Sequence, residues 1–170
     1  MFGRSYFTCF VSLLALLGPA AAAELYRVDF RPPVQVKNDG GLLSRNPEGD
    51  GSVIDHVKNT LGNEDPWVST TSNYNIAKGG AKSPGNVYVY YIDPSGLNAV
   101  DTIQAFKDAG EVHPHPGEAE FSVKGSIPWD HITKWDTFKR SKKTATTTRE
   151  EFDQGHGGSV KARSIRSFVA

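Results

Sequence analysis

Three short groups of polar residues in this sequence have types and spacings that could carry out chemistry. They are Arg27 with Asp29, the hydroxyl run Ser69–Ser72, and Glu118 with Glu120. Two carboxylates on one face of a strand repel each other when both are charged, so we expect the pKa of one to rise. Such a pair suits cleavage of an N- or O-glycosidic bond, where one carboxylate stabilises a developing cation and the other accepts a proton. An arginine nearby would hold a phosphate or carboxylate group of the substrate.

Each group also has a purely structural interpretation. Glu118 and Glu120 could form the solvated face of a strand, and Arg27 could be a surface residue in a salt bridge. A hydroxyl run often marks a strand edge or a turn. His113 and His115 could contribute to a metal site, but each is followed by proline and the sequence offers no evident third ligand. We therefore expect no metal site.

The first polar group lies on a predicted strand, Leu25–Arg31, along which residues of opposite polarity alternate. The apolar side chains at positions 26, 28 and 30 are expected to face the core, which places Arg27 and Asp29 together on the other face. The prolines at positions 32 and 33 end the strand, because proline lacks the N–H group that a sheet requires.

A helix is predicted to begin at Ser52, which is spaced with Asp55 as a capping box. His56 lies about 115° from the centre of the apolar face of this helix, at 100° per residue. The histidine is therefore expected to point away from the main packing surface of the helix.

The rest of the sequence predicts three more strands and a second helix. Strands are predicted at Trp67–Thr71 and Asn86–Ile92 from their aromatic and β-branched residues. A helix capped by Asn98 and Asp101 should end at Gly110. The alternating segment Glu118–Lys124 predicts a strand with both glutamates on one face. Strands outnumber helices and are scattered among them, so the expected class is α+β.

The first 23 residues resemble a secretory signal peptide rather than part of the fold. Arg4 is followed by the apolar run Ser5–Leu17 and by small residues up to Ala23. The run has 13 residues, whereas a membrane-spanning helix needs about 20. We therefore expect a secreted protein without a membrane span. Cys9 is the only cysteine and would leave with the signal peptide, which excludes disulfide and thiol chemistry.

The charges divide the mature chain into two parts. Residues 24–138 carry 10 basic and 16 acidic residues, and residues 139–170 carry 8 basic and 3 acidic residues. The acidic first part is the expected catalytic domain, and its charge argues against nucleic acid as the partner. The second part is polar with few apolar groups, so we predict a flexible basic tail.

Taken in order, the polar groups and their surroundings resemble the enzymatic A1 chain of the heat-labile enterotoxin and cholera toxin family. The matching segments lie between Glu24 and about Trp135 and read LYRVDFRPP, GGLLSR, DHVKNT, WVSTTS, VYYID and HPHPGEAEFSVKGSIPW. The resemblance implies an α+β ADP-ribosyltransferase fold in which two small, mostly antiparallel sheets flank an NAD cleft. It also implies a mono-ADP-ribosyltransferase that uses NAD⁺ as its substrate and releases nicotinamide.

The same resemblance implies roles for four residues around the cleft. Arg27 would hold the NAD phosphates or ribose, and Asp29 would support the cleft. His56 aligns with a family histidine near the site. Ser69 would brace the cleft and position the catalytic glutamate.

The two glutamates would divide the chemistry between them. Glu120 would bond the nicotinamide ribose and stabilise the oxocarbenium-like transition state, and Glu118 would orient or deprotonate the acceptor. A Glu-x-Glu motif goes with arginine acceptors in the wider superfamily, so the resemblance implies a toxin-like protein that modifies arginine on a host protein. An NAD⁺ glycohydrolase and a non-catalytic member that only binds a partner remain as alternatives.

The sequence departs from the family in three respects. Thr71 replaces the usual serine of the Ser-Thr-Ser element, and the segments Gly41–Asp55 and Thr60–Trp67 look shorter than in the enterotoxins. In the family, the two shorter segments hold the loop that covers the resting site and is displaced on activation, so the resemblance leaves regulation by a host factor open. No disulfide to an A2 chain is expected, and the sequence does not support assembly with a ring of B subunits.

Overall fold

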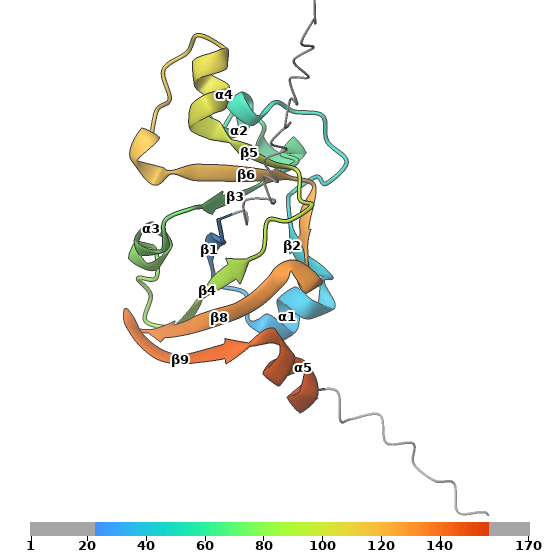
Figure 1. Cartoon of the computed structure of the whole chain (residues 1–170), viewed down its shortest axis with the longest axis vertical. Coiled ribbons are helices and arrows are strands. Elements are labelled where there is room, and N and C mark those ends of the chain that lie inside the picture. The colour runs from blue at the N-terminus through green and yellow to red at the C-terminus, as the bar shows by residue number, and fades with distance from the viewer. Residues whose placement is uncertain (1–22, 157–170) are drawn as a thin grey trace, which may run out of the picture.

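The computed structural model describes residues 23–156 (Figure 1). The predicted signal peptide, except for Ala23, and the last 14 residues of the predicted tail, 157–170, lie outside the described residues. Within the described part of the chain, no helix has both the length and the apolar character needed to cross a membrane.

One antiparallel sheet of seven strands dominates the structure, and a separate pair of strands accompanies it. The seven-stranded sheet has the order β5-β6-β3-β1-β4-β8-β9, and the pair is β2-β7. The strands are β1 (Leu25–Asp29), β2 (Gly41–Leu43), β3 (Trp67–Thr71), β4 (Asn86–Ile92), β5 (Ala99–Asp101), β6 (Glu120–Lys124), β7 (Ser126–Pro128), β8 (Ile132–Lys139) and β9 (Lys142–Thr148). The predicted α+β class is confirmed.

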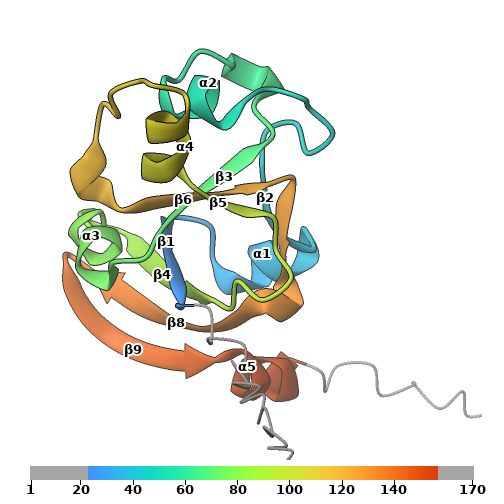
Figure 2. The ribbon, with the colours of Figure 1, turned by 45° about the horizontal axis from the view of Figure 1, so that its top comes forward.

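The large sheet is divided into two halves at the junction of β1 and β3. These two strands share a single residue pair, Tyr26 opposite Thr71, whereas β1 and β4 share five pairs. Figure 2 shows β3, β5 and β6 diverging from β1, β4 and β8. The two small sheets that were expected on either side of a cleft thus correspond to two halves of one sheet.

The helices are short and lie around the sheet. They are α1 (Pro33–Asn38), α2 (Val53–Val57), α3 (Tyr74–Gly79), α4 (Thr102–Asp108) and α5 (Arg149–His156), with 3-10 turns η1 (Gly62–Glu64), η2 (Pro116–Glu118) and η3 (Trp129–His131). The predicted N-cap at Ser52 is confirmed, since Ser52 Oγ accepts a hydrogen bond from the Asp55 N–H at 3.1 Å. The other half of the predicted capping box differs, because the Asp55 carboxylate accepts from Ser52 Oγ at 2.6 Å rather than from the Ser52 N–H.

The second predicted helix begins later than expected. Ala99–Asp101 forms the edge strand β5, and α4 starts at Thr102, with the Asp101 side chain as its N-cap. Phe106 is buried, whereas Ile103 is 40% exposed. The sequence offered two capping residues, and the structure uses the second because Ala99 and its neighbours pair with β6.

Strand β1 is shorter than predicted and is covered on both faces. It ends at Asp29, so Phe30 leaves the sheet and is 63% exposed rather than buried. Leu25 packs into the main core, while Tyr26 and Val28 pack against a second cluster that includes Val89.

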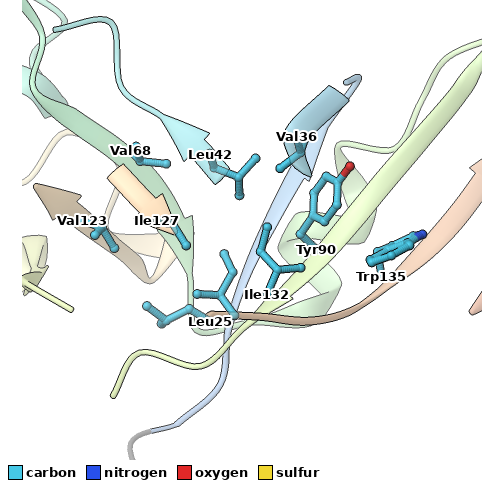
Figure 3. Packing of buried hydrophobic residues seen from close by; sticks show 10 residues of the cluster. Leu25, Val36, Leu42, Val68, Tyr90, Val123, Ile127, Ile132 and Trp135 are labelled. Carbon is cyan, nitrogen blue, oxygen red and sulfur yellow. The ribbon is translucent and has the colours of Figure 1, made fainter. Parts of the chain in front are cut away.

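The main core joins the two halves of the sheet. Figure 3 shows side chains from β1, β3, β6 and β8 meeting in one cluster with residues of α1, β2, β4 and β7. Its members include Leu25, Val36, Leu42, Val68, Tyr90, Val123, Ile127, Ile132 and Trp135. Because the backbone link between the halves is only one residue pair, this packing fixes their relative position.

The prediction of a flexible tail from residue 139 is wrong for residues 142–156. Strand β9 pairs with β8 over six residue pairs, and α5 follows it directly (Figure 1). Phe152 of α5 packs edge-on against Trp135 at 5.1 Å, and Lys37 forms an ion pair with Asp153 at 2.8 Å. The polar composition was misleading because β9 is an exposed edge strand, and threonine favours extended backbone without any apolar pattern.

Candidate active site

A cleft of about 520 Å³ lies where the two halves of the sheet meet. Its lining includes five of the six residues that the sequence analysis selected, namely Arg27, His56, Ser69, Glu118 and Glu120. The sixth, Asp29, touches Arg27 without lining the cleft. This volume lies within the range of small-molecule sites.

Glu120 is the buried carboxylate of the cleft. It is the first residue of β6 and is only 9% exposed. Ser122 Oγ donates a hydrogen bond to Glu120 Oε1 at 3.1 Å, and His56 Nε2 lies 3.5 Å from the same oxygen. Burial alone would raise the pKa of Glu120, but hydrogen bonds from His56, Ser69 and Ser122 outweigh it and lower the pKa. The carboxylate therefore stays charged.

His56 connects the helix α2 to this carboxylate. Its Nδ1 lies 2.7 Å from Asp65 Oδ2, and its Nε2 lies 2.9 Å from Ser69 Oγ. Because a carboxylate only accepts, Nδ1 carries a proton and donates it to Asp65. Burial would lower the pKa of His56, but the bonds to Glu120 and Asp65 raise it above 6.5. The off-core position that the helix pattern predicted for His56 thus turns its ring toward the cleft.

Asp65 is a site residue that the sequence analysis missed. One carboxylate oxygen binds His56, and the other accepts a hydrogen bond from the Trp67 N–H at 3.0 Å. The second contact is local, because aspartate side chains often accept a hydrogen bond from the backbone N–H two residues later. The sequence did show that Asp65 comes just before the predicted strand that carries Ser69. No pattern within the neighbouring residues identified His56 as its partner.

The Arg27 side chain reaches from β1 to β3. Its Nη1 donates to the Ser69 carbonyl oxygen at 2.6 Å, and its Nε lies 3.4 Å from Asp29 Oδ2. Asp29 also accepts hydrogen bonds from the Arg31 guanidinium, at 2.7 and 3.0 Å. Burial lowers the pKa of Arg27 from its usual value, although an arginine remains charged. The half-buried Arg27 guanidinium therefore lies at the cleft and is held by the Ser69 carbonyl oxygen.

Glu118 is not on the strand face that the alternation predicted. It is exposed in the turn η2, while β6 begins only at Glu120. Ala119 between them has φ +45°, a left-handed conformation that interrupts the alternation of a strand. Thr71 Oγ1 holds this turn by donating to the Glu118 carbonyl oxygen at 2.7 Å. Both carboxylates still reach the cleft, one buried and one at the surface.

The two histidines of the loop before η2 differ in their surroundings, because His113 is packed inside the protein whereas His115 is exposed and lines the cleft. His113 is buried, and its ring nitrogens contact Thr102 Oγ1 and the His115 N–H. Across residues 23–156, no three His, Cys, Asp or Glu side chains are grouped so that they could hold a metal ion.

Comparisons with known proteins identify relatives of this chain. A family model described as the heat-labile enterotoxin alpha chain matches residues 5–154. The chain is 30% identical over 146 residues to the heat-labile enterotoxin A chain of Escherichia coli, covering 74% of this chain and 54% of that protein. The A chain of cholera enterotoxin from Vibrio cholerae is 29% identical over 130 residues, covering 66% and 48%. The chain thus spans about half the length of these relatives.

A relative with a more specific name is the NAD(+)–arginine ADP-ribosyltransferase Chelt of Vibrio cholerae. It is 30% identical over 145 residues, which cover 74% of this chain and 24% of that protein.

Solved structures show the same fold. A heat-labile enterotoxin mutant superimposes with a TM-score of 0.61 at 25% identity, covering 79% of each chain. The Scabin toxin from Streptomyces scabies, solved in complex with NADH, superimposes with a TM-score of 0.60 at 24% identity, covering 75% of this chain and 74% of that one. The chain, with its glutamate pair and braced arginine in a shared cleft, belongs to the heat-labile enterotoxin alpha chain family.

Proposed function

We propose that this protein is a mono-ADP-ribosyltransferase that transfers ADP-ribose from NAD⁺ to an arginine of a target protein. The observation that carries the proposal is the Glu120 carboxylate, which is charged, buried and held by His56 and Ser122 in a cleft that also contains Arg27. The name of Chelt, an NAD(+)–arginine ADP-ribosyltransferase, supports both the activity and the arginine acceptor.

The reaction breaks the bond between the nicotinamide nitrogen and C1′ of its ribose. Nicotinamide leaves as a neutral base with the electron pair of that bond, and positive charge develops on the ribose. A fixed carboxylate close to the ribose stabilises this charge, which is the role of Glu120. Arg27 supplies the cationic group for the phosphates or ribose of NAD⁺.

The acceptor guanidinium nitrogen then forms the new bond to C1′ and must lose a proton. Glu118 is suited to take that proton because it is exposed at the edge of the same cleft, where a protein side chain can reach it. The difference in burial between the two glutamates supports this division: Glu120 faces the NAD⁺ substrate, and Glu118 faces the acceptor.

The test is incubation of residues 24–170 with labelled NAD⁺ and an arginine-rich protein, with release of free ADP-ribose measured in parallel. In Glu120→Gln, both transfer and hydrolysis should fall by at least about a hundredfold, the usual effect of losing a main stabilising group in the transition state. In Glu118→Gln, transfer to arginine should fall much more than hydrolysis.

The outcomes separate the candidate functions. Free ADP-ribose without label on arginine would favour an NAD⁺ glycohydrolase, and NAD⁺ binding without either product would favour a binding protein. Equal loss of both activities in Glu118→Gln would contradict the division of roles between the glutamates.

We further propose that the protein is secreted after removal of residues 1–23, acts on host cells, and has no disulfide-linked A2 chain. The order of charged, apolar and small residues before Glu24 supports secretion, and the absence of cysteine after Cys9 supports the lack of a disulfide. Sequencing the N-terminus of the exported protein tests the first point, with Glu24 expected as the first residue.

A further inference from the structure

His113 is the one buried side chain in an otherwise exposed loop. The loop runs from α4 to η2 (Figure 1). His113 is 7% exposed, whereas Val112, the residue before it, is 91% exposed. The imidazole packs against Phe106 with ring centroids 4.7 Å apart. A buried imidazole requires partners for both nitrogens, and His113 has them.

The partners define a single arrangement of protons. His113 Nδ1 lies 2.9 Å from the backbone nitrogen of His115, which can only donate, so Nδ1 must be unprotonated. In the neutral ring the proton is then on Nε2, which donates to Thr102 Oγ1 at 2.9 Å. The Thr102 hydroxyl in turn donates to the Glu120 carbonyl oxygen at 3.0 Å.

The two sides of the ring therefore reach the two glutamates of the cleft by separate routes. On the Nδ1 side, His113 fixes the backbone of His115, whose carbonyl oxygen accepts from the Glu118 N–H at 3.1 Å and so starts the turn η2. On the Nε2 side, Thr102 fixes the first residue of β6, Glu120. One imidazole is thus linked through hydrogen bonds to the backbone of both glutamates.

We propose that His113 is a positioning residue that places Glu118 for the acceptor, through its Nδ1 side, and thereby sets how much ADP-ribose goes to arginine rather than to water. This inference rests on the proposed transferase function. The simpler interpretation is that His113 only fills space beside Phe106, and the test must distinguish the two.

Two substitutions each remove the ring but keep a different half of its hydrogen bonding. His113→Asn keeps an oxygen near the Nδ1 position, where it can accept from the N–H two residues later, as asparagine commonly does. His113→Gln keeps an amide N–H near the Nε2 position and lacks that local acceptor. Both variants lose the same aromatic packing, so each serves as the control for the other.

The quantity to measure is the ratio of transfer to hydrolysis in the full protein. His113→Gln should lower this ratio about fivefold, the effect expected from one lost hydrogen bond. His113→Asn should keep the ratio of the wild type, and any loss should affect both products equally. Equal ratios in the two variants, whether changed or not, would overturn the proposal.

A measurement on the wild type does not depend on activity or on the folding of a variant. The ¹⁵N shifts of His113 should show the Nε2–H tautomer, and the His115 amide should exchange with solvent at least about tenfold more slowly than that of Val112. An Nδ1–H tautomer, or equal exchange of the two amides, would overturn the role of His113 even in an active enzyme. If the protein transfers nothing to arginine although the Nε2–H tautomer and the slow exchange of the His115 amide are both observed, the proposed function fails. The structural role of His113 in holding the loop would then still be supported.

Discussion

The chemistry of the cleft is determined by how Glu120 is surrounded. The sequence pattern suggested two glutamates that repel each other, with the pKa of one raised. In the structure the pKa of Glu120 is lowered, because His56, Ser69 and Ser122 supply more stabilisation to the charged form than burial removes. Glu118 lies in a different element and is exposed. A buried carboxylate that stays charged suits stabilisation of a developing cation better than general acid catalysis.

The contact between His56 and Glu120 should make stability depend on pH. The pKa of His56 is raised, so its contribution is complete below about pH 6.5 and is lost as the pH rises through the raised value. The pKa of Glu120 is lowered, so its contribution is present above its unfolded value and is lost only in acid. His56→Gln should therefore cost about 2 kcal/mol near pH 6 and much less at pH 9.

Urea unfolding of wild type and His56→Gln at pH 6 and pH 9 measures this difference directly. His131→Gln is a suitable control, since Nδ1 of the His131 ring contacts a backbone carbonyl oxygen, that of Asp93, at 3.0 Å. A loss in His56→Gln that is the same at both pH values would show that the charged pair does not contribute.

At the scale of elements, the sequence predicted single strands and caps better than it predicted breaks within them. The alternation around Tyr26 and the capping box at Ser52 describe interactions within a few residues, and both elements formed. The left-handed conformation of Ala119 could not be read from an alanine, because the turn is held by Thr71 at the end of β3 and by Ser72 just after it. The same limit explains why Asp65 was missed, since its partner lies nine residues away in a helix.

The cap of α2 gives a prediction that links local structure to the site. Ser52→Ala removes the acceptor for the Asp55 N–H and should lower the free energy of unfolding by about 1 kcal/mol. Because the helix is only five residues long and carries His56, NAD⁺ hydrolysis should also fall. Ser52→Thr keeps a capping oxygen and should lie close to wild type in urea unfolding and in NAD⁺ hydrolysis. A stable but inactive Ser52→Ala protein would mean that the serine acts in the cleft rather than on the helix.

At the scale of the whole molecule, the cleft exists because the two halves of the sheet separate after one residue pair. Tyr26 and Thr71 form that pair and both line the cleft. The sequence showed the strands on either side but not their divergence, because strand order and register are set by contacts far apart in the chain. The candidate residues were selected by type and order along the chain. Their convergence depends on the core cluster that joins the halves.

The last segment of the described chain, which includes α5, packs against the main core away from the cleft. A substitution there should therefore change stability but leave activity unchanged. Phe152 packs against Trp129 and Trp135, and the cleft lining includes no residue of β8, β9 or α5. Phe152→Ala should lower the free energy of unfolding by about 2 kcal/mol, less than for a fully buried phenylalanine. At temperatures well below unfolding, NAD⁺ hydrolysis and transfer should be unchanged.

Phe30→Ala is the matched control, because the same side chain is removed from a site that is 63% exposed. It should change the free energy of unfolding by less than about 0.5 kcal/mol. If Phe152→Ala is as stable as wild type, then α5 does not contribute to the core, and the expectation of a loosely attached basic tail would apply to it. If the variant is folded but inactive, the segment after residue 139 acts on the cleft, and the catalytic domain must extend beyond residue 138. Unfolding in urea and the two activities, measured on the same samples, decide among these results.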